Sequence, residues 1–207
     1  SIMSMVGAKT YAYEFEAKNS DGVTIYYDYY NNGKELKVTC EKVKTSGDIV
    51  RYYSYYSGNV VIPEEVTYMG HTRKVTCIGR DAFTKCRDLK SVTIPKSVTT
   101  IESYAFYECS GLTSIIIPQN VSYIGSGAFY GCIGLTSITI PKNVTTIGAL
   151  AFNYCDNLAT VISLIENPFE IVGPTSESRV FSNNTFYNAT LYVPFGTIEK
   201  YKSTKGW

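Results

Sequence analysis

Histidine is almost absent from this sequence of 207 residues: His71 is the only one, and it lies where a turn is expected. A serine or cysteine nucleophile needs a neighbouring base, most often histidine, and zinc sites combine histidine with closely spaced cysteines. No C-x-x-C pair occurs, and Gly125-Ser126-Gly127 lacks the following Lys and Ser or Thr of a phosphate-binding loop. We therefore expect no catalytic residue, no metal ion and no cofactor, and predict that the chain is not an enzyme.

Neither sign of charge is in excess, because 19 basic and 18 acidic residues give a formal net charge of +1. Nucleic acids and anionic membrane surfaces are bound by basic patches, so neither is an expected partner. Apolar runs fall short of the roughly 20 residues that cross a bilayer, so no membrane span is expected. Residues 1–10 lack the pattern of a signal peptide, and we predict that they form a disordered or extended leader.

Aromatic residues are abundant by contrast, with 19 tyrosines, many of them in runs rich in threonine and valine. These residue types favour strands over helices. We therefore expect a β-rich chain with little helix.

A strict repeat runs from Ile78 to Leu158, where four segments align without gaps at a step of 23 residues. The residues that recur are Ile78, Ile101, Ile124 and Ile147; Phe83, Phe106, Phe129 and Phe152; Cys86, Cys109, Cys132 and Cys155; and Leu89, Leu112, Leu135 and Leu158. One such segment cannot bury its apolar side chains alone, whereas stacked copies share a continuous core. The sequence therefore predicts a solenoid with 23-residue coils.

Within each coil the pattern predicts a short strand that ends at a proline. In the second copy, Ile115 and Ile117 should point inward and Ile116 outward, because side chains alternate along a strand. Pro118 has no N–H to donate and should end the strand. The step Ala105-Phe106 suits a tight turn or a single helical turn.

The repeat becomes irregular at both ends. Twelve steps separate Val66 from Ile78 but only three separate Val98 from Ile101, so we expect a hairpin around Met69-Gly70. A shortened terminal capping coil is expected at about 181–207, with Thr185-Phe186 in the place of Ala-Phe. Residues 198–202 are expected to form a short helix, with Thr197 as its N-cap.

The N-terminal part carries turn signals at 21–22, 31–33 and 46–48, separated by strand-like runs. We predict that residues 11–57 form an N-terminal antiparallel β-meander, a cap that covers the strand edges of the first coil. Residues 58–207 then form the solenoid, with regular coils at 78–162.

The repeat has the pattern I-G-x-x-A-F-x-x-C-x-x-L-x-S-[IV]-x-I-P-x-x-V-x-x-I, with Glu102 in place of glycine in the second copy. This pattern resembles the BspA-like leucine-rich repeat proteins of bacterial surfaces, and residues 1–57 do not share it. The resemblance implies export and a right-handed α+β repeat solenoid, curved, with a parallel sheet on its concave face. It also implies adhesion to host matrix proteins or to neighbouring cells.

Four of the six cysteines, at 86, 109, 132 and 155, share one repeat position, so their side chains should all point the same way. A free cysteine behaves as a small hydrophobic residue. We therefore expect a ladder of buried thiols and no disulfides along it.

The outward strand positions form rows of small polar residues that we take as the candidate binding surface. They are Lys90, Ser91, Thr93, Thr113, Ser114, Ile116, Thr136, Ser137 and Thr139. Such a surface suits a peptide or a glycan bound through many weak contacts, although threonine also simply favours strands. Exposed tyrosines, among them Tyr52, Tyr53, Tyr55, Tyr56, Tyr107 and Tyr130, are an alternative contact surface, although about half of them are expected only to pack.

Three functions remain open at this point. The first is an extracellular or cell-surface binding module, acting as a monomer on a protein or glycan ligand. The second is a spacer without a ligand of its own. A hydrolase comes third, because Glu64 and Glu65 have no second acid placed opposite them across a cleft.

Overall fold

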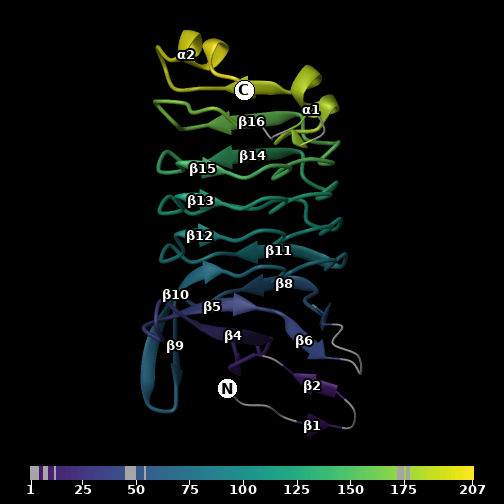
Figure 1. Cartoon of the computed structure of the whole chain (residues 1–207), viewed down its shortest axis with the longest axis vertical. Helices are drawn as coiled ribbons and strands as arrows, with labels where there is room; N and C mark the ends of the chain where they lie inside the picture. The colour runs from purple at the N-terminus through teal and green to yellow at the C-terminus, as the bar shows by residue number, and fades with distance from the viewer. Residues whose placement is uncertain are drawn as a thin grey trace.

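The computed structural model describes residues 5–6, 9–11, 13–44, 50–53, 55–171, 175 and 178–207. The chain forms a tall stack with its N-terminal strands at one end and two short helices at the other (Figure 1). Strands far outnumber helices, which confirms the β-rich prediction.

Residues near the N-terminus contribute to two sheets. Four strands, β1 (Met5–Val6), β2 (Lys9–Tyr11), β6 (Glu41–Lys44) and β7 (Val50–Tyr53), form an antiparallel sheet in the order β1-β2-β6-β7. The other three, β3 (Phe15–Lys18), β4 (Thr24–Tyr30) and β5 (Glu35–Thr39), form an antiparallel meander that we call the N-terminal strands. The turn expected at 46–48 lies outside the described residues.

The meander is shorter than the sequence predicts because β5 has no free edge. One edge pairs with β4, and the other pairs in parallel with β10 (His71–Ile78), with Val38 opposite Ile78. No edge is left for β6, which pairs with β2 and β7 instead. The N-terminal strands therefore continue directly into a sheet of the repeats.

Two columns of parallel strands run along the stack. The first holds β8 (Gly58–Val61), β11 (Leu89–Thr93), β14 (Ser137–Ile140), β16 (Thr160–Ser163) and β17 (Thr190–Tyr192). The second holds β10, β12 (Thr100–Ile101), β13 (Tyr123–Ile124) and β15 (Thr146–Ile147), paired in register from Ile78 through Ile101 and Ile124 to Ile147. We refer to residues 78–100, 101–123 and 124–146 as the first, second and third repeats.

A column of stacked phenylalanines fills the middle of the core. The rings of Phe83, Phe106, Phe129 and Phe152 follow one another at centroid distances of 5.0, 5.1 and 5.2 Å and lie within 4° of parallel. The inward positions of the strands are buried beside them, as the alternation predicts. Burying rings of this size is a main source of stability in a stack whose repeats cannot fold alone.

The column ends on two aromatic residues that the sequence does not place there. Tyr56 lies 4.6 Å from Phe83 at one end, and Phe181 lies 5.6 Å from Phe152 at the other. Tyr56 is buried and donates its hydroxyl hydrogen to the Thr39 carbonyl, so its assignment to an exposed surface is wrong. Phe186, expected to continue the repeat, is 41% exposed.

The cysteines of the repeat are buried thiols, as predicted. Each thiol from Cys109 onward donates a hydrogen bond to a backbone carbonyl of the preceding repeat, at distances of 3.0 to 3.1 Å: Cys109 to Phe83, Cys132 to Phe106 and Cys155 to Phe129. These hydrogen bonds link neighbouring repeats through the core.

The Ala-Phe step forms a tight turn and not a helical turn. Its backbone reaches the next repeat, because the Phe83 N–H donates to the Ala105 carbonyl at 2.7 Å and Phe106 donates likewise to Ala128. Two residues in each of these turns have positive φ, for example Lys85 at 59° and Gly131 at 71°.

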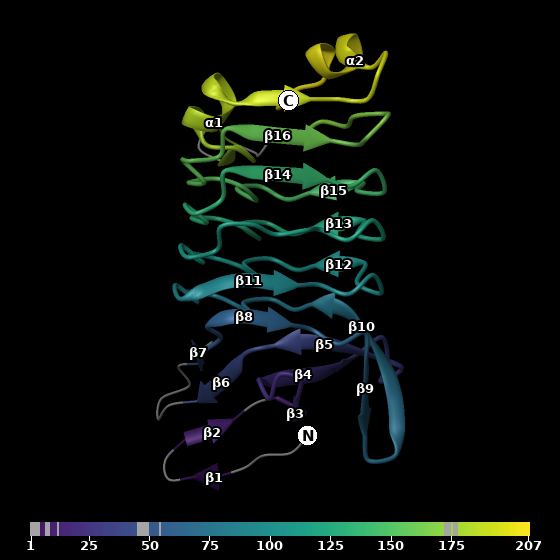
Figure 2. The same ribbon diagram turned by 180° about the vertical axis from the view of Figure 1, so that it is seen from behind.

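The expected hairpin is confirmed, since β9 (Glu65–Tyr68) pairs antiparallel with β10 and places Tyr68 opposite His71. It leaves the stack beside the N-terminal strands (Figure 2). There the Tyr68 ring stacks on Phe15 at 4.1 Å, and the Arg73 Nε donates to the Gly33 carbonyl at 2.7 Å. The hairpin thus fastens the N-terminal strands to the repeats.

Two helices lie at the C-terminal end, α1 (Asn183–Asn188) and α2 (Ile198–Ser203). The short helix expected from residue 198 is confirmed. Thr197 is at its N-cap, but its hydroxyl donates to the Pro194 carbonyl at 2.7 Å and makes no capping bond to the helix.

Candidate functional site

The nine residues of the candidate surface lie on the outward side of the first strand column. Eight of them are exposed and Ser91 is half-buried. Ile116 is 83% exposed, which is unusual for an isoleucine in the middle of a β-rich domain. We call the outward side of β8, β11, segment 113–116, Thr136, β14, β16 and β17 the Ser/Thr face. The burial pattern agrees with the predicted orientation, and the role of these residues in binding stays a prediction.

Strand pairing arranges the Ser/Thr face in two rows along the stack. In the first row, Ser137 is opposite Thr160, and Thr160 is opposite Thr190; at the other end Ser91 is opposite Asn59 and donates a hydrogen bond to it at 2.8 Å. The first row carries small polar side chains, so hydroxyl groups are its main hydrogen-bonding groups. The one charged residue of the candidate surface, Lys90, lies outside both rows.

The second row alternates threonine with apolar residues. Its members, in order along the stack, are Val61, Thr93, Ile116, Thr139, Ile162 and Tyr192. Tyr192 is 56% exposed. A ligand lying across the strands would therefore meet apolar contacts and hydroxyl groups in turn.

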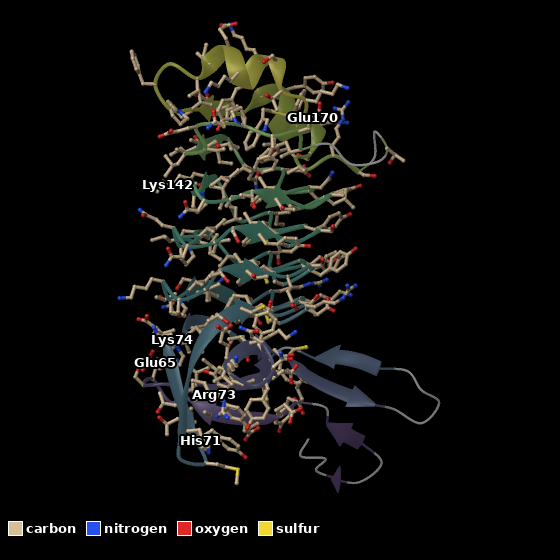
Figure 3. The ribbon with its side chains drawn as sticks, turned by 60° about the vertical axis from the view of Figure 1, so that its left-hand side comes forward. Glu65, His71, Arg73, Lys74, Lys142 and Glu170 are labelled. Atoms are coloured by element: carbon tan, nitrogen blue, oxygen red, sulfur yellow. The ribbon has the colours of Figure 1, made fainter. Side chains whose placement is uncertain are left out.

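A hollow of about 330 Å³ lies at the C-terminal end of the Ser/Thr face. Its lining includes Ile162, Leu164, Tyr192 and Pro194, with one basic and one acidic side chain, Lys142 and Glu166. Lys142 extends outward from the stack (Figure 3).

The repeat pattern does not predict this hollow, because the hollow lies where the fourth copy departs from that pattern. Leu164 occupies the position that is Pro95, Pro118 and Pro141 in the other copies. That substitution is the signal that could have pointed to it.

The catalytic alternatives receive no geometric support among the described residues. His71 is exposed on the β9–β10 hairpin (Figure 3), whereas the cysteines are buried within the stack. Glu64 lies 3.9 Å from Lys96, an ordinary surface ion pair. No group of three or more His, Cys, Asp or Glu in this part of the chain could hold a metal ion.

The tyrosines proposed as an alternative contact surface differ in exposure. Tyr55 is 71% exposed, Tyr107 and Tyr130 are half-buried, and the side chains of Tyr52 and Tyr53 lie outside the described part of the chain. The ring of Tyr107 stacks on that of Tyr130 at 5.1 Å, so these two cover each other's faces. A hydrogen bond to Glu108, together with partial burial, raises the pKa of Tyr107 to about 12.

A family model described as the BspA type leucine rich repeat region matches residues 52–191 in six copies. This chain belongs to that family. The BspA-type match extends beyond the four copies that align without gaps, reaching into β7 on one side and β17 on the other.

Three solved structures of leucine-rich repeat proteins are similar to this BspA-type chain. One from Bacteroides ovatus is 24% identical, with 83% of this chain and 54% of that one covered and a TM-score of 0.47. One from Bacteroides capillosus is 23% identical (82% and 94% covered, TM-score 0.51), and one from T. pallidum is 21% identical (77% and 79%, TM-score 0.52). This chain thus spans about half the length of the first. At these identities the likeness concerns the fold alone.

Comparison with curated proteins gives no match. No helix within the described residues has the length and apolar character needed to span a membrane.

Proposed function

We propose that this chain is a recognition module, displayed on a bacterial surface or released from the cell, that binds a protein or glycan ligand through the Ser/Thr face. The proposed architecture is a right-handed solenoid of 23-residue coils, curved so that this face is concave, with residues 11–57 as its cap. It acts as a monomer, without cofactor, and has no enzymatic role.

The observation that carries the proposal is the pair of exposed rows on the Ser/Thr face. An isoleucine that is 83% exposed and a tyrosine that is 56% exposed lie in one row with threonines, and the row ends at a hollow. Aromatic and aliphatic side chains among adaptable hydroxyl groups are typical of surfaces that recognise a partner. A spacer would have no use for large apolar side chains exposed in one line.

The test is binding of the purified chain to arrayed extracellular-matrix proteins and glycans. A variant with Thr113→Glu, Thr136→Glu and Thr139→Glu places three carboxylates on the face, which should abolish binding because each would have to be desolvated beneath the ligand. The matched control carries Ile133→Glu, Thr145→Glu and Thr146→Glu, three exposed positions away from this face. The control should bind as the parent does.

Three results are distinguishable. Loss of binding in the first variant alone supports the Ser/Thr face. Binding that survives in both variants moves the site elsewhere. If the parent binds nothing on the array, the spacer function is favoured and the proposal fails.

A further inference from the structure

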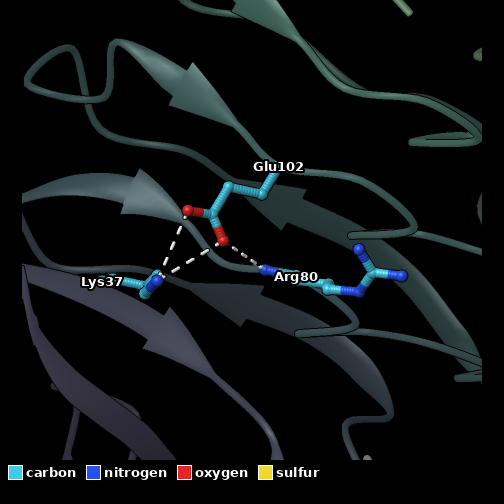
Figure 4. Close-up of polar contacts among 3 residues, drawn as sticks. All are labelled: Lys37, Arg80 and Glu102. Atoms are coloured by element: carbon cyan, nitrogen blue, oxygen red, sulfur yellow. Dashed lines mark hydrogen bonds and ion pairs between the residues drawn. The ribbon is translucent and has the colours of Figure 1, made fainter.

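Glu102 breaks the repeat at one position. The corresponding residues of the neighbouring copies are Gly79, Gly125 and Gly148. Its carboxylate accepts a hydrogen bond from the Arg80 N–H at 2.8 Å and lies 3.3 Å from the Lys37 ammonium (Figure 4). Strand β5, the first repeat and the second repeat therefore meet at this carboxylate.

Beside this junction lies a hollow of about 530 Å³. Its lining consists of Tyr30, Arg80, Thr100, Glu102, Ser103 and Tyr123. Tyr30 comes from β4 and Tyr123 from β13, so an aromatic side chain from each of two distant strands borders one hollow. Tyr123 is 38% exposed, which leaves part of its ring open to a ligand. The hollow belongs to the second strand column and is distinct from the Ser/Thr face.

The hydrogen-bonding groups of the hollow suit hydroxyl groups. The Glu102 carboxylate only accepts, the Arg80 guanidinium only donates, and the hydroxyls of Thr100 and Ser103 do both. A sugar hydroxyl also donates and accepts, so it can satisfy each of these groups. The apolar C–H face of a pyranose ring packs against an aromatic ring, which Tyr123 supplies.

The charges of the hollow are internally balanced. Glu102 is paired with Lys37, and Arg80 lies 3.5 Å from Asp81. An anionic sugar would be attracted by Arg80 but repelled by the Glu102 and Asp81 carboxylates. A cation would be attracted by the carboxylates but repelled by Arg80. This balance favours a neutral ligand.

A second hollow of about 450 Å³ is lined by the residues that directly follow Arg80 and Ser103 in the first and second repeats. Asp81, Lys85, Tyr104 and Tyr107 are part of its lining. Arg80 lies between the two, since its guanidinium carbon is 5.2 Å above the Tyr104 ring while its side chain also lines the first hollow. The two hollows together offer room for more than one sugar ring.

We propose that these two hollows form a binding site for a neutral oligosaccharide, with one pyranose ring against Tyr123 and its hydroxyls bound by Arg80, Glu102 and Ser103. This site is independent of the Ser/Thr face.

The experiment is a titration of the full chain, by isothermal calorimetry and by saturation-transfer NMR. The probes are neutral trisaccharides of glucose, galactose, mannose or N-acetylglucosamine, with trigalacturonate as the anionic probe. The variants are Tyr123→Ala and Arg80→Ala, and the matched control is Tyr154→Ala, an exposed tyrosine outside both hollows. We expect at least one neutral probe to bind saturably, with a Kd at least tenfold higher in both variants and unchanged in the control.

The proposal is overturned if no neutral probe binds saturably at millimolar concentration, if only trigalacturonate binds, or if Tyr123→Ala binds as the parent does. The variant with three glutamates on the Ser/Thr face should bind the neutral probe normally. Failure there would place the sugar on the Ser/Thr face and not in the two hollows.

Discussion

Lys85 and Gly131 occupy equivalent positions in the turns of the first and third repeats, and both have positive φ. This left-handed conformation costs about 1–2 kcal/mol for a residue with a Cβ and almost nothing for glycine. Lys85 is exposed, so its side chain contributes little packing to offset that cost.

We therefore expect Lys85→Gly to raise the free energy of unfolding by up to about 1 kcal/mol. Gly131→Ala should lower it by about 1 kcal/mol, because the new Cβ would also lie 3.2 Å from the Glu108 side chain. Urea unfolding of both variants measures the two changes. Changes of the same sign would contradict the argument.

Because of the buried thiols, the free energy of unfolding should fall as the pH rises into the alkaline range. Burial raises the pKa of Cys155 from 9.0 to about 12 and holds that of Cys132 well above its usual value. Because the folded pKa is the higher one, the stabilisation is complete below about pH 9 and is lost as the pH rises from there. Each such thiol contributes a slope of about 1.4 kcal/mol per pH unit in this range.

We expect Cys132→Ala to show a shallower loss of stability between pH 9 and 11 than the parent, under reducing conditions. Urea unfolding at several pH values gives both slopes, and tyrosine ionisation contributes equally to each. Equal slopes would mean that the thiol at 132 ionises as readily in the folded chain as in the unfolded one.

At the scale of one element, the terminal repeat is closed by the segment around Phe181. The Phe152 N–H donates to the Val180 carbonyl at 2.8 Å, just as the Phe129 N–H donates to Ala151. Val180-Phe181 thus takes the place of the Ala-Phe step. The sequence points instead to Thr185-Phe186, because valine replaces the alanine on which the alignment depends.

Phe181→Ala should lower the free energy of unfolding by roughly 3–5 kcal/mol, since it removes a buried ring from the end of the stack. Phe186→Ala is the control and should change it by less than about 1 kcal/mol, because Phe186 remains 41% exposed. Thermal and urea unfolding compare the two. A larger effect at Phe186 would restore the sequence-based assignment.

The contrast between the repeats and the N-terminal strands shows how far sequence reasoning reaches. The four aligned copies allow the buried Phe, Cys and Leu residues to be predicted, because each residue packs against its own counterpart in the next copy. The parallel pairing of β5 with β10 joins residues about 40 positions apart and has no local pattern. The hollow beside Glu102 escapes prediction for the same reason, since Tyr30 and Tyr123 are brought together only by that pairing and the register of β10, β12 and β13.

For the whole molecule, the common register implies that one repeat can be removed. Deleting residues 124–146 joins Tyr123 to Ile147 and brings Ile147 opposite Ile101, a pair of the same kind as those removed. We expect this variant to fold and to unfold in one cooperative transition at a lower temperature, because one set of neighbour contacts is lost.

The control deletes residues 124–135, about half of a repeat, and should not fold because it places inward residues outward. Circular dichroism and thermal unfolding distinguish the two outcomes. If both shortened chains fold, or if neither folds, register does not organise the stack.

The pairing of β5 with β10 also bears on how the chain assembles as it is made from its N-terminus. The N-terminal strands are made before the repeats and present the edge of β5, with which residues 71–78 pair once they follow. Each later repeat then adds to the edge left by the one before, as a monomer adds to the growing end of a polymer. We therefore expect the repeats to be added in this order during synthesis. A lesion in β5 would remove the strand on which β10 pairs, whereas a lesion in β17 would remove only the last pairing of its column.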